Sequence, residues 1–242
     1  MADASPLFVY PITGIGEVTD RTDLAALFAE RLGGEQGGPE LQDQDVLVVT
    51  QKIISKAEGR IVPLDHSDES AKTALVEEES VRVLRRRGPL LITETRHGFV
   101  CANAGIDLSN VDEGTAALLP VDPDRSARRL RADLRRRLGV EVAVIISDTF
   151  GRTWRQGVTD IALGSAGILP VLDLRGTIDA NGRPLVATEI CVVDEITGAA
   201  DLVMGKATNI PAAIVRGCDP AWFGSGSVAE DVIRRPDEDL FR

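Results

Sequence analysis

Two apolar, strand-like runs each end in a glycine-containing turn that is rich in oxygen ligands, and this repeated pattern constrains the chain most. Residues 90–101 lead into Asn-Ala-Gly-Ile-Asp-Leu-Ser-Asn (103–110), and residues 140–146 lead into Ser-Asp-Thr-Phe-Gly-Arg (147–152). Each turn carries a carboxylate, Asp107 or Asp148, beside amide or hydroxyl oxygens. Mg²⁺ and Mn²⁺ prefer such oxygen ligands, and a site of this kind leaves coordination positions open for substrate phosphates. The pattern indicates a metal site on turns that follow strands.

A third segment, residues 53–60, places Lys56 just after another apolar strand. Carboxylates for a metal and a cation for phosphate together indicate phosphoryl transfer. An alternative remains open for each segment, because Asp and Asn are also ordinary turn residues whose side chains bond to nearby backbone. The common glycine patterns of nucleotide sites are absent. Residues 14–17 (Gly-Ile-Gly-Glu) either offer backbone amides to a triphosphate or form a plain turn.

Five stretches of the chain resemble a known family. They are VVTQKIISKAEGR (48–60), CANAGIDLSNVDEG (101–114), LLPVDPDRSARRLR (118–131), IISDTFGRTWRQGV (145–158) and MGKATNIPAAIVRG (204–217). In this order and spacing they are similar to the coenzyme F420:L-glutamate ligases, the γ-glutamyl ligases of deazaflavin coenzyme biosynthesis. The resemblance runs from PITGIGEV (11–18) to the last expected strand. It implies an intertwined homodimer.

The reaction implied by the resemblance joins the carboxylate of coenzyme F420-0 to the amino group of L-glutamate, with GTP as co-substrate. Repeated addition would extend a γ-linked polyglutamate tail. Because direct condensation in water is unfavourable, we expect the carboxylate to be activated as an acyl phosphate before the amine attacks. The implied ions are Mg²⁺ or Mn²⁺, with K⁺ as a further candidate; they would neutralise charge on the phosphates.

The resemblance also assigns roles to residues of this chain. Asp107, Asp148 and Thr149 match metal ligands, and Asp107, Asp148 and Lys56 are the expected catalytic residues. The residues expected to bind nucleotide are Ile15, Gly16, Glu17, Val18, Gln51, Lys52, Lys56, Asn110, Met204, Gly205, Lys206, Ala207, Thr208, Asn209 and Ile210.

Lysine is scarce, since only four of the 27 basic residues are lysine, at positions 52, 56, 72 and 206. A lysine is a compact point charge, suited to a phosphate where a planar guanidinium does not fit; chance placement is the alternative. Lys206 departs from relatives that carry an acidic or amide side chain in this loop. A protonated lysine cannot bind a metal, so a second metal held by this side chain is not expected.

Trp154 lies between Arg152 and Arg155, just past the second carboxylate turn. In a chain with 4% aromatic residues, an indole between two arginines is suited to stacking on a deazaflavin ring or seating an anionic phosphodiester. These three residues are therefore candidates for substrate binding. Packing of Trp154 in the core is the alternative.

Composition excludes several classes of protein. A net charge of −11, from 27 basic and 38 acidic residues, disfavours nucleic-acid binding. The one basic run, residues 125–137, holds seven arginines and reads as a solvated helix face. No apolar run is long enough for a membrane helix, and no signal peptide is evident, so we expect a cytoplasmic protein. Three separated cysteines and two histidines indicate no zinc site, disulfide framework or histidine-based triad.

The expected elements alternate between helix and strand. Helices are predicted at 22–32, capped by Thr22 or Asp20, and at 70–87, 125–138 and 194–204. Strands are predicted at 45–50, 140–147, 168–174, 185–193 and 212–216, with hairpin turns at 96–98 and 179–182. A polar loop is predicted at 33–44. This order favours an α/β fold with mixed sheets, not a regular doubly wound domain.

We expect residues 1–242 to form one ligase domain, with two intertwined subdomains as an alternative and no C-terminal reductase-like domain. Two rival functions remain for the same residues. One is a metal-dependent nucleotide phosphohydrolase, and the other is a non-catalytic domain that binds a nucleotide or deazaflavin.

Overall fold

A computed structural model describes residues 6–34 and 39–240 of the protein. Parts of the expected 33–44 loop and of the two chain ends lie outside these residues. The fold is mixed α/β, as predicted, with one five-stranded sheet and three small sheets among the described residues. The five-stranded sheet comprises β1 (Phe8–Pro11), β12 (Ala212–Arg216), β2 (Val46–Thr50), β8 (Ala143–Arg152) and β9 (Arg155–Ala166), in that order.

Strands β2 and β8 form the parallel centre of this sheet, and the other neighbouring strands pair antiparallel. Residues 46–49 of β2 and 143–146 of β8 are wholly apolar, because these parts of the two strands are buried on both faces. Successive side chains point to opposite faces. Val48 and Ile145 therefore join one core, while Val49 and Ile146 join the other.

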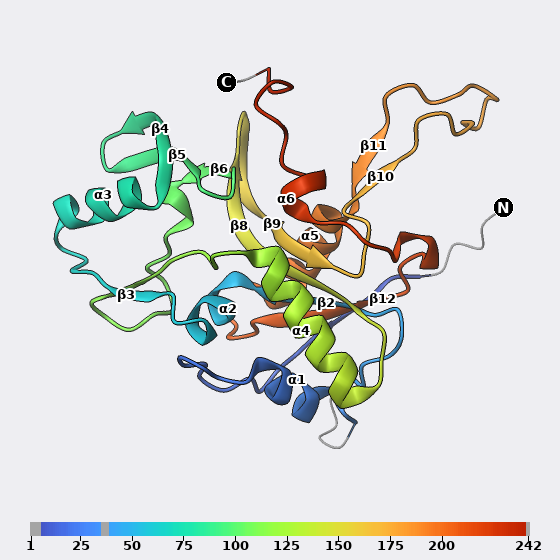
Figure 1. Ribbon diagram of the computed structural model, residues 1–242, viewed down its shortest axis with the longest axis horizontal. Helices are drawn as coiled ribbons and strands as arrows, with labels where there is room; N and C mark the ends of the chain where they lie inside the picture. Colours follow the sequence, from blue (N-terminus) through green and yellow to red (C-terminus); the bar gives the residue numbers. More distant parts are fainter. Residues whose placement is uncertain (1–5, 35–38, 241–242) are drawn as a thin grey trace.

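Helices cover the two faces of the central sheet (Figure 1). On one face α1 (Leu24–Leu32) packs against α4 (Pro123–Leu138), with α2 (Gln51–Ala57) beside them. The other face is covered by α5 (Val192–Met204) and the short α6 (Val228–Asp231). No helix within the described part of the chain is long and apolar enough to cross a membrane.

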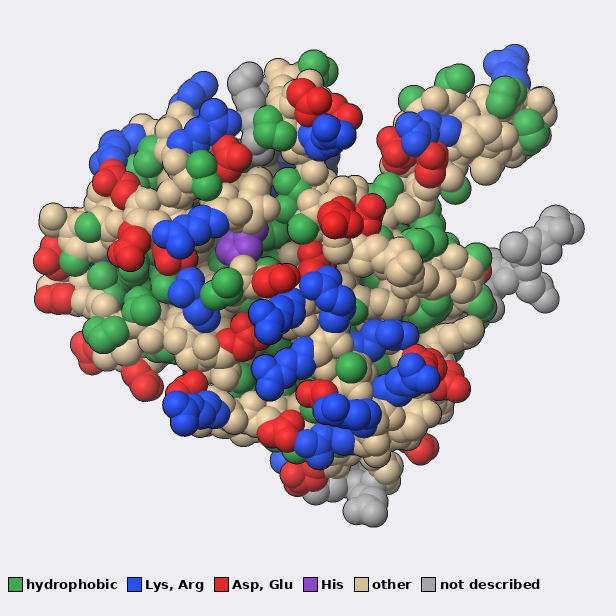
Figure 2. Space-filling view, viewed as in Figure 1, with side chains coloured by type: hydrophobic (Ala, Val, Ile, Leu, Met, Phe, Trp, Pro, Cys, Tyr) green, Lys and Arg blue, Asp and Glu red, His purple; other side chains and the backbone are tan. Residues whose placement is uncertain are grey.

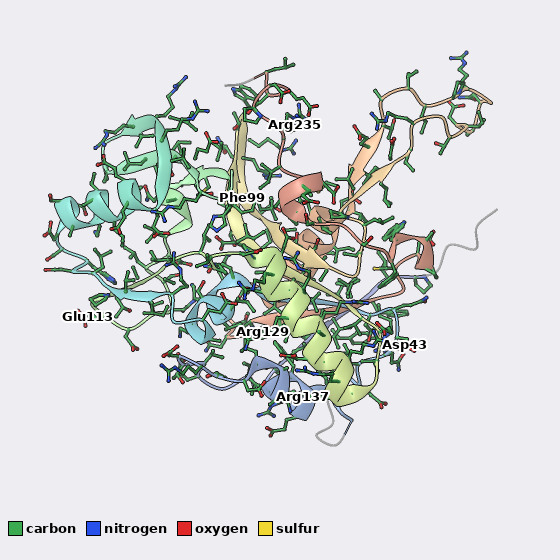
Figure 3. The ribbon with its side chains drawn as sticks, in the orientation of Figure 1. Asp43, Phe99, Glu113, Arg129, Arg137 and Arg235 are labelled. Atoms are coloured by element: carbon green, nitrogen blue, oxygen red, sulfur yellow. The ribbon has the colours of Figure 1, made fainter. Side chains whose placement is uncertain are left out.

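The basic helix α4 confirms the prediction for 125–138, starting two residues earlier. Asp122 caps its N-terminus by accepting a hydrogen bond from the Arg125 backbone, and Gly139 ends it with φ +73°. Leu130 and Leu134 are buried on its inner side. Its arginines lie on the outer side, where Lys and Arg side chains gather over the helix in Figure 2 and where Figure 3 labels Arg129 and Arg137.

The N-terminus of α4 is tied to the sheet by a buried carboxylate. Asp124 accepts hydrogen bonds from the backbone N–H groups of Ser165 (2.8 Å), Val228 (2.9 Å) and Ala229 (3.0 Å). A Cβ on Gly164 would lie 2.3 Å from the carbonyl carbon of Pro123, so β9 passes directly beneath the helix start. This contact explains why glycine stands at that point of a buried strand.

Two predicted boundaries were wrong. The first helix is capped by Asp23, whose side chain accepts from the Ala26 backbone, because the Thr22 hydroxyl instead accepts from the Thr19 backbone. The predicted helix 70–87 is split into α3 (Glu69–Glu78) and strand β4 (Ser80–Arg87). The β4 segment pairs antiparallel with β5 (Leu90–Thr95) across a turn at Gly88, so pairing with a neighbouring strand overrides its local helical pattern.

The prediction of a turn at 147–152 was also wrong, since β8 continues through this segment to Arg152. It forms a hairpin with β9, a strand that the sequence pattern did not reveal, and the chain turns beyond Arg152. Asp148 and Thr149 therefore lie on a strand, opposite Ile161 and Asp160.

The remaining predicted elements are present, but the strands expected at 168–174 and 185–193 are reduced to three residues each, and residues 192–193 belong to the following helix. The turn predicted at 96–98 connects β5 and β6 (Val100–Ala102), and the last helix and strand match α5 and β12. The turn at 179–182 closes the tip of an arm built on β10 (Val171–Asp173) and β11 (Glu189–Cys191), which projects from the body in Figure 1. β3 (Ile61–Pro63) pairs with β7 (Thr115–Ala117). All three cysteines are free thiols.

Candidate active site

One edge of the central sheet carries the candidate site. Because β1 runs in the same direction as the parallel pair β2 and β8, β1 and β2 both end at this edge, β8 extends beyond it, and the antiparallel β12 begins there. Thr50 pairs with Ser147, so α2 begins beside the second half of β8, which extends past β2 and stays paired with β9. Ligand sites of α/β proteins lie at such edges. An open cleft of about 590 Å³ is found here.

Most of the residues that the sequence singled out line this cleft, although they come from five distant segments. They are Ile15, Gly16, Glu17, Val18, Gln51, Lys52, Lys56, Asp107, Asn110, Asp148, Thr149, Gly205, Lys206, Asn209 and Ile210. Asp107 reaches the cleft from a loop that is held to Ala117 by a pair of backbone hydrogen bonds. The structure thus brings the three motifs and the two glycine-containing loops together.

Six of the predicted residues do not line the cleft. Met204 is buried at the end of α5, and Ala207 and Thr208 belong to the outer part of the following loop. Arg152, Trp154 and Arg155 are exposed at the tip of the β8–β9 hairpin. Trp154 has 80% of its surface exposed and φ +61°, so the alternative that it packs in the core was wrong.

Three lysine ammonium groups face carboxylates around the cleft. Lys52 Nζ lies 2.8 Å from Asp107 Oδ2, Lys56 pairs with Glu17, and Lys206 Nζ lies 3.6 Å from Asp160 Oδ1. Ammonium and carboxylate charges therefore alternate along its wall. Such a surface is suited to an anionic ligand that brings its own cation, since both signs of charge find a partner.

Asp107 is held in its ionised form. Burial alone would raise the pKa of its carboxyl, but the hydrogen bonds from Lys52 and from the backbone and hydroxyl of Ser109 outweigh this effect and lower the pKa. Ser109 donates both bonds to Oδ1 at 2.7 Å, and Oδ2 faces Lys52.

Asp148 has the opposite character. Burial raises the pKa of its carboxyl to about 7; the Thr149 backbone opposes this rise, and the nearby charges of Asp107 and Asp160 add to it. Within the described residues it forms no ion pair, although Lys206 is near enough to lower its pKa slightly. A carboxyl in such a place is stabilised by a cation.

Asp160 is a charged residue of the cleft that sequence reasoning missed. It is 3% exposed and lies on β9 opposite Thr149, whose hydroxyl donates to its Oδ1. Ser147, likewise unpredicted, donates to its Oδ2 at 3.1 Å. Asp160 was missed because the strand that carries it, β9, was not predicted. Without that strand, nothing in the sequence indicated which residues lie beside Asp160.

The donor set suits a hard divalent ion. The Thr149 hydroxyl donates its hydrogen bond to Asp160, so only its oxygen lone pairs remain available to a cation. The carboxylates of Asp107 and Asp148 line the same cleft. No cluster of three or more His, Cys, Asp or Glu side chains with metal-binding geometry occurs in the described ranges. Further ligands would therefore come from substrate oxygens and water, as is usual for Mg²⁺.

The cleft thus combines ammonium groups with carboxylate and hydroxyl oxygens, a lining suited to a phosphate group together with a hard cation. Residues 14–217 match the family described as F420-0:Gamma-glutamyl ligase. The chain is similar to proteins named "Coenzyme F420:L-glutamate ligase". That of Methanothermobacter thermautotrophicus is 41% identical over 96% of this chain and 95% of its own length, and that of Archaeoglobus fulgidus is 41% identical over 97% and 96%. That of Methanopyrus kandleri is 39% identical over the full length of both. This chain belongs to the F420-0:gamma-glutamyl ligase family.

Proposed function

We propose that this protein forms an amide between the carboxylate of coenzyme F420-0 and the amino group of L-glutamate, at the expense of GTP. The observation that carries the proposal is the gathering of Lys52, Lys56, Asp107 and Asp148 in one cleft of a chain of this family. Carboxylates and ammonium groups in alternation are what a phosphoryl-transfer step requires. Repeated use of the γ-carboxylate would extend a polyglutamate tail.

The nucleotide is proposed to lie along the wall that carries the lysines. Lys52 and Lys56 project from α2 toward the cleft, where their charges are suited to phosphate oxygens. The loop of residues 15–18 and Asn110 face the same space, as do parts of the 204–210 loop. These segments are the proposed contacts of GTP.

Asp107, Asp148 and Thr149 are the proposed ligands of Mg²⁺ or Mn²⁺, with K⁺ as a further candidate ion. When bound, a divalent ion supplies positive charge that neutralises the phosphates and polarises the phosphoryl group. The protein's own contribution is to hold two carboxylates and an acceptor hydroxyl in place on β8 and its neighbouring loop.

The proposed reaction has two balanced steps. A carboxylate oxygen of F420-0 attacks the γ-phosphorus and GDP leaves, which produces an acyl phosphate. The amine of glutamate then attacks the acyl carbon, the carbon–oxygen bond to phosphate breaks, inorganic phosphate leaves, and the proton lost by the amine passes to the released phosphate or to water. Lysine side chains around the cleft would hold the phosphates of GTP while the carboxylate of F420-0 is brought to the γ-phosphorus.

The hairpin tip is the proposed site of the deazaflavin. Arg152, Trp154 and Arg155 are exposed there, outside the cleft, and present an indole beside two guanidinium groups. We also propose that the described residues act as a single ligase domain and that the protein is a homodimer. Exposed apolar side chains on the arm, Ile178 and Val186, support an interface with a second copy.

The test follows oxygen from the substrate. F420-0 labelled with ¹⁸O in its acceptor carboxylate is incubated with GTP, L-glutamate and Mn²⁺, and the phosphate and deazaflavin products are analysed by mass spectrometry. We expect one ¹⁸O in the released phosphate and a glutamyl product. Phosphate without ¹⁸O, whose fourth oxygen comes from water and which is released without glutamate, would identify a phosphohydrolase. Binding of GTP or deazaflavin without turnover would identify a binding domain.

A further inference from the structure

Asp160 is a buried carboxylate at the back of the cleft. It is 3% exposed, and the β8–β9 register places it opposite Thr149. Ser147 Oγ donates to its Oδ2 at 3.1 Å and Thr149 Oγ1 donates to its Oδ1. A buried charge without partners is costly, and here two hydroxyl groups on the neighbouring strand stabilise it.

These hydrogen bonds determine what the two hydroxyls offer to a ligand. A hydroxyl has one proton and two lone pairs. Ser147 and Thr149 both line the cleft, and both hydroxyls donate a hydrogen bond to Asp160. Each hydroxyl oxygen therefore has only lone pairs left for a ligand in the cleft. This wall therefore accepts a cation and repels a phosphate oxygen.

Lys206 is the third partner of Asp160, and it is held more loosely. Its Nζ lies 3.6 Å from Oδ1, beyond hydrogen-bond range, and its side chain is 62% exposed against 4% for Asp160. Lys52, by contrast, is 16% exposed, with Nζ 2.8 Å from Asp107 and 3.0 Å from the Ser109 hydroxyl. Lys206 is thus an ammonium group that can leave its carboxylate without breaking a hydrogen bond.

We propose that Asp160 is a positioning residue with two effects: it orients the Thr149 hydroxyl as a cation ligand, and it pairs loosely with Lys206, so that it competes with a phosphate for this ammonium group until a cation binds. This inference rests on the proposed function. Asp160 touches neither ligand and acts through its two neighbours. While the cleft is empty, Lys206 balances the charge of Asp160. A divalent ion held beside Thr149 would supply the positive charge that balances Asp160, and Lys206 would then be free to contact a phosphate oxygen.

The two effects predict opposite changes on two binding equilibria. Neutralising Asp160 removes the orientation of Thr149 but leaves Lys206 available, so divalent-ion binding weakens and metal-free nucleotide binding does not. Removing the charge of Lys206 has two consequences. The divalent ion no longer competes with an ammonium group near Asp160, and a bound phosphate loses a positively charged partner. Ion binding then tightens, and metal-free nucleotide binding weakens.

The experiment measures Mn²⁺ alone, and a non-hydrolysable GTP analogue in EDTA, by isothermal titration of the full chain. For Asp160→Asn we expect at least tenfold weaker Mn²⁺ binding, with nucleotide binding unchanged or tighter. For Lys206→Met we expect the reverse pattern. The matched control is Asp201→Asn on α5, a carboxylate close enough to feel Lys206 but outside the cleft lining, and both affinities should stay within about twofold.

A second pair of variants covers the case in which Asp160→Asn does not fold, judged by circular dichroism and thermal unfolding. Thr149→Val removes the hydroxyl and should reproduce the loss of Mn²⁺ affinity, while Thr149→Ser should retain it. Equal weakening of both ligands in the position 160 and 206 variants, or no effect in either, would overturn the inference. If the unaltered protein binds neither Mn²⁺ nor the analogue, the proposed function itself fails.

Discussion

The ammonium group of Lys52 lies 2.8 Å from Oδ2 of Asp107, at the centre of the candidate active site. Lys52 comes from the first turn of α2 and Asp107 from a loop more than fifty residues later, and Ser109 bonds to both side chains. The pair keeps a carboxylate ionised where burial opposes ionisation. It also means that a metal ion and Lys52 compete for the same oxygen.

Replacing Lys52 tests the contribution of this pair to stability. Asp107 has a lowered pKa in the folded protein, so its ionisation stabilises the fold above the ordinary value of 3.8, and this stability is lost as the pH falls through the folded pKa. We expect Lys52→Met to cost about 1 kcal/mol at pH 6, since the pair is only partly buried, and much less at pH 3. Urea unfolding at several pH values measures this difference.

The control for that measurement is Lys72→Met. Lys72 pairs with Glu69 on the surface of α3, where the glutamate is 63% exposed. Such a pair contributes little, so its removal should change the free energy of unfolding by less than about 0.5 kcal/mol at any pH. A Lys52 variant that behaves like this control would show that the Asp107 pair has no stabilising role.

Asp148 predicts a pH-dependent metal affinity. Burial raises its pKa to about 7, so below that pH the folded protein carries a proton that a metal must displace. Mn²⁺ affinity should therefore rise with pH to about 7 and level off above it. Calorimetry in two buffers of different ionisation enthalpy should detect close to one proton released at pH 6. Asp148→Asn should release none, and an unaltered proton count in that variant would remove Asp148 from the metal site.

Lys56 separates nucleotide binding from amino-acid binding. Its side chain is 15% exposed and pairs with Glu17, which is 74% exposed and so is a weak competitor for a phosphate. Lys56→Ala should raise the KM for GTP by roughly 30-fold, about 2 kcal/mol, and leave the KM for glutamate nearly unchanged. Steady-state kinetics with each substrate varied in turn makes the comparison.

The matched variant is Glu17→Gln, which keeps the shape of the partner but removes its charge. It frees Lys56, so the KM for GTP should stay the same or fall. A parallel rise in both Michaelis constants for Lys56→Ala would instead identify a lysine that only supports the structure.

Asp124 tests how the sheet and α4 are joined, away from the cleft. Its buried carboxylate accepts three backbone hydrogen bonds. Asp124→Asn leaves one oxygen and turns an amide N–H₂ toward backbone donors, which should cost about 2–3 kcal/mol of unfolding free energy. Asp122→Asn is the control, because asparagine caps a helix as well as aspartate does. Chemical denaturation of both variants should show a loss for position 124 alone.

Local patterns in the sequence were sufficient for much of the fold. The run Val46–Thr50 is apolar without alternation, and it is a central strand buried on both faces. The helix predicted at 125–138 likewise matches α4, which begins only two residues earlier. These elements follow from burial and capping, which depend on the residues of the segment itself.

Segments whose partner lies elsewhere in the chain could not be assigned in this way. Ser80–Arg87 has residues compatible with a helix, yet it is a strand because β5 is available to pair with it. The 147–152 segment contains the Gly and Asp of a turn, yet β9 pairs with it through Arg152. Strand pairing depends on residues outside the segment itself, and it overrides weak local preferences.

The same distinction applies to the site. The chemistry of Asp107, Asp148 and Lys56 was evident from residue types and from the family that the motifs resemble, because a carboxylate or an ammonium group carries its function in its own atoms. The ion pairs of Lys52 with Asp107 and of Lys206 with Asp160, and the raised pKa of Asp148, were decided by the tertiary structure. Charge interactions and burial depend on which segments meet at the edge of the sheet, and sequence spacing does not encode those distances.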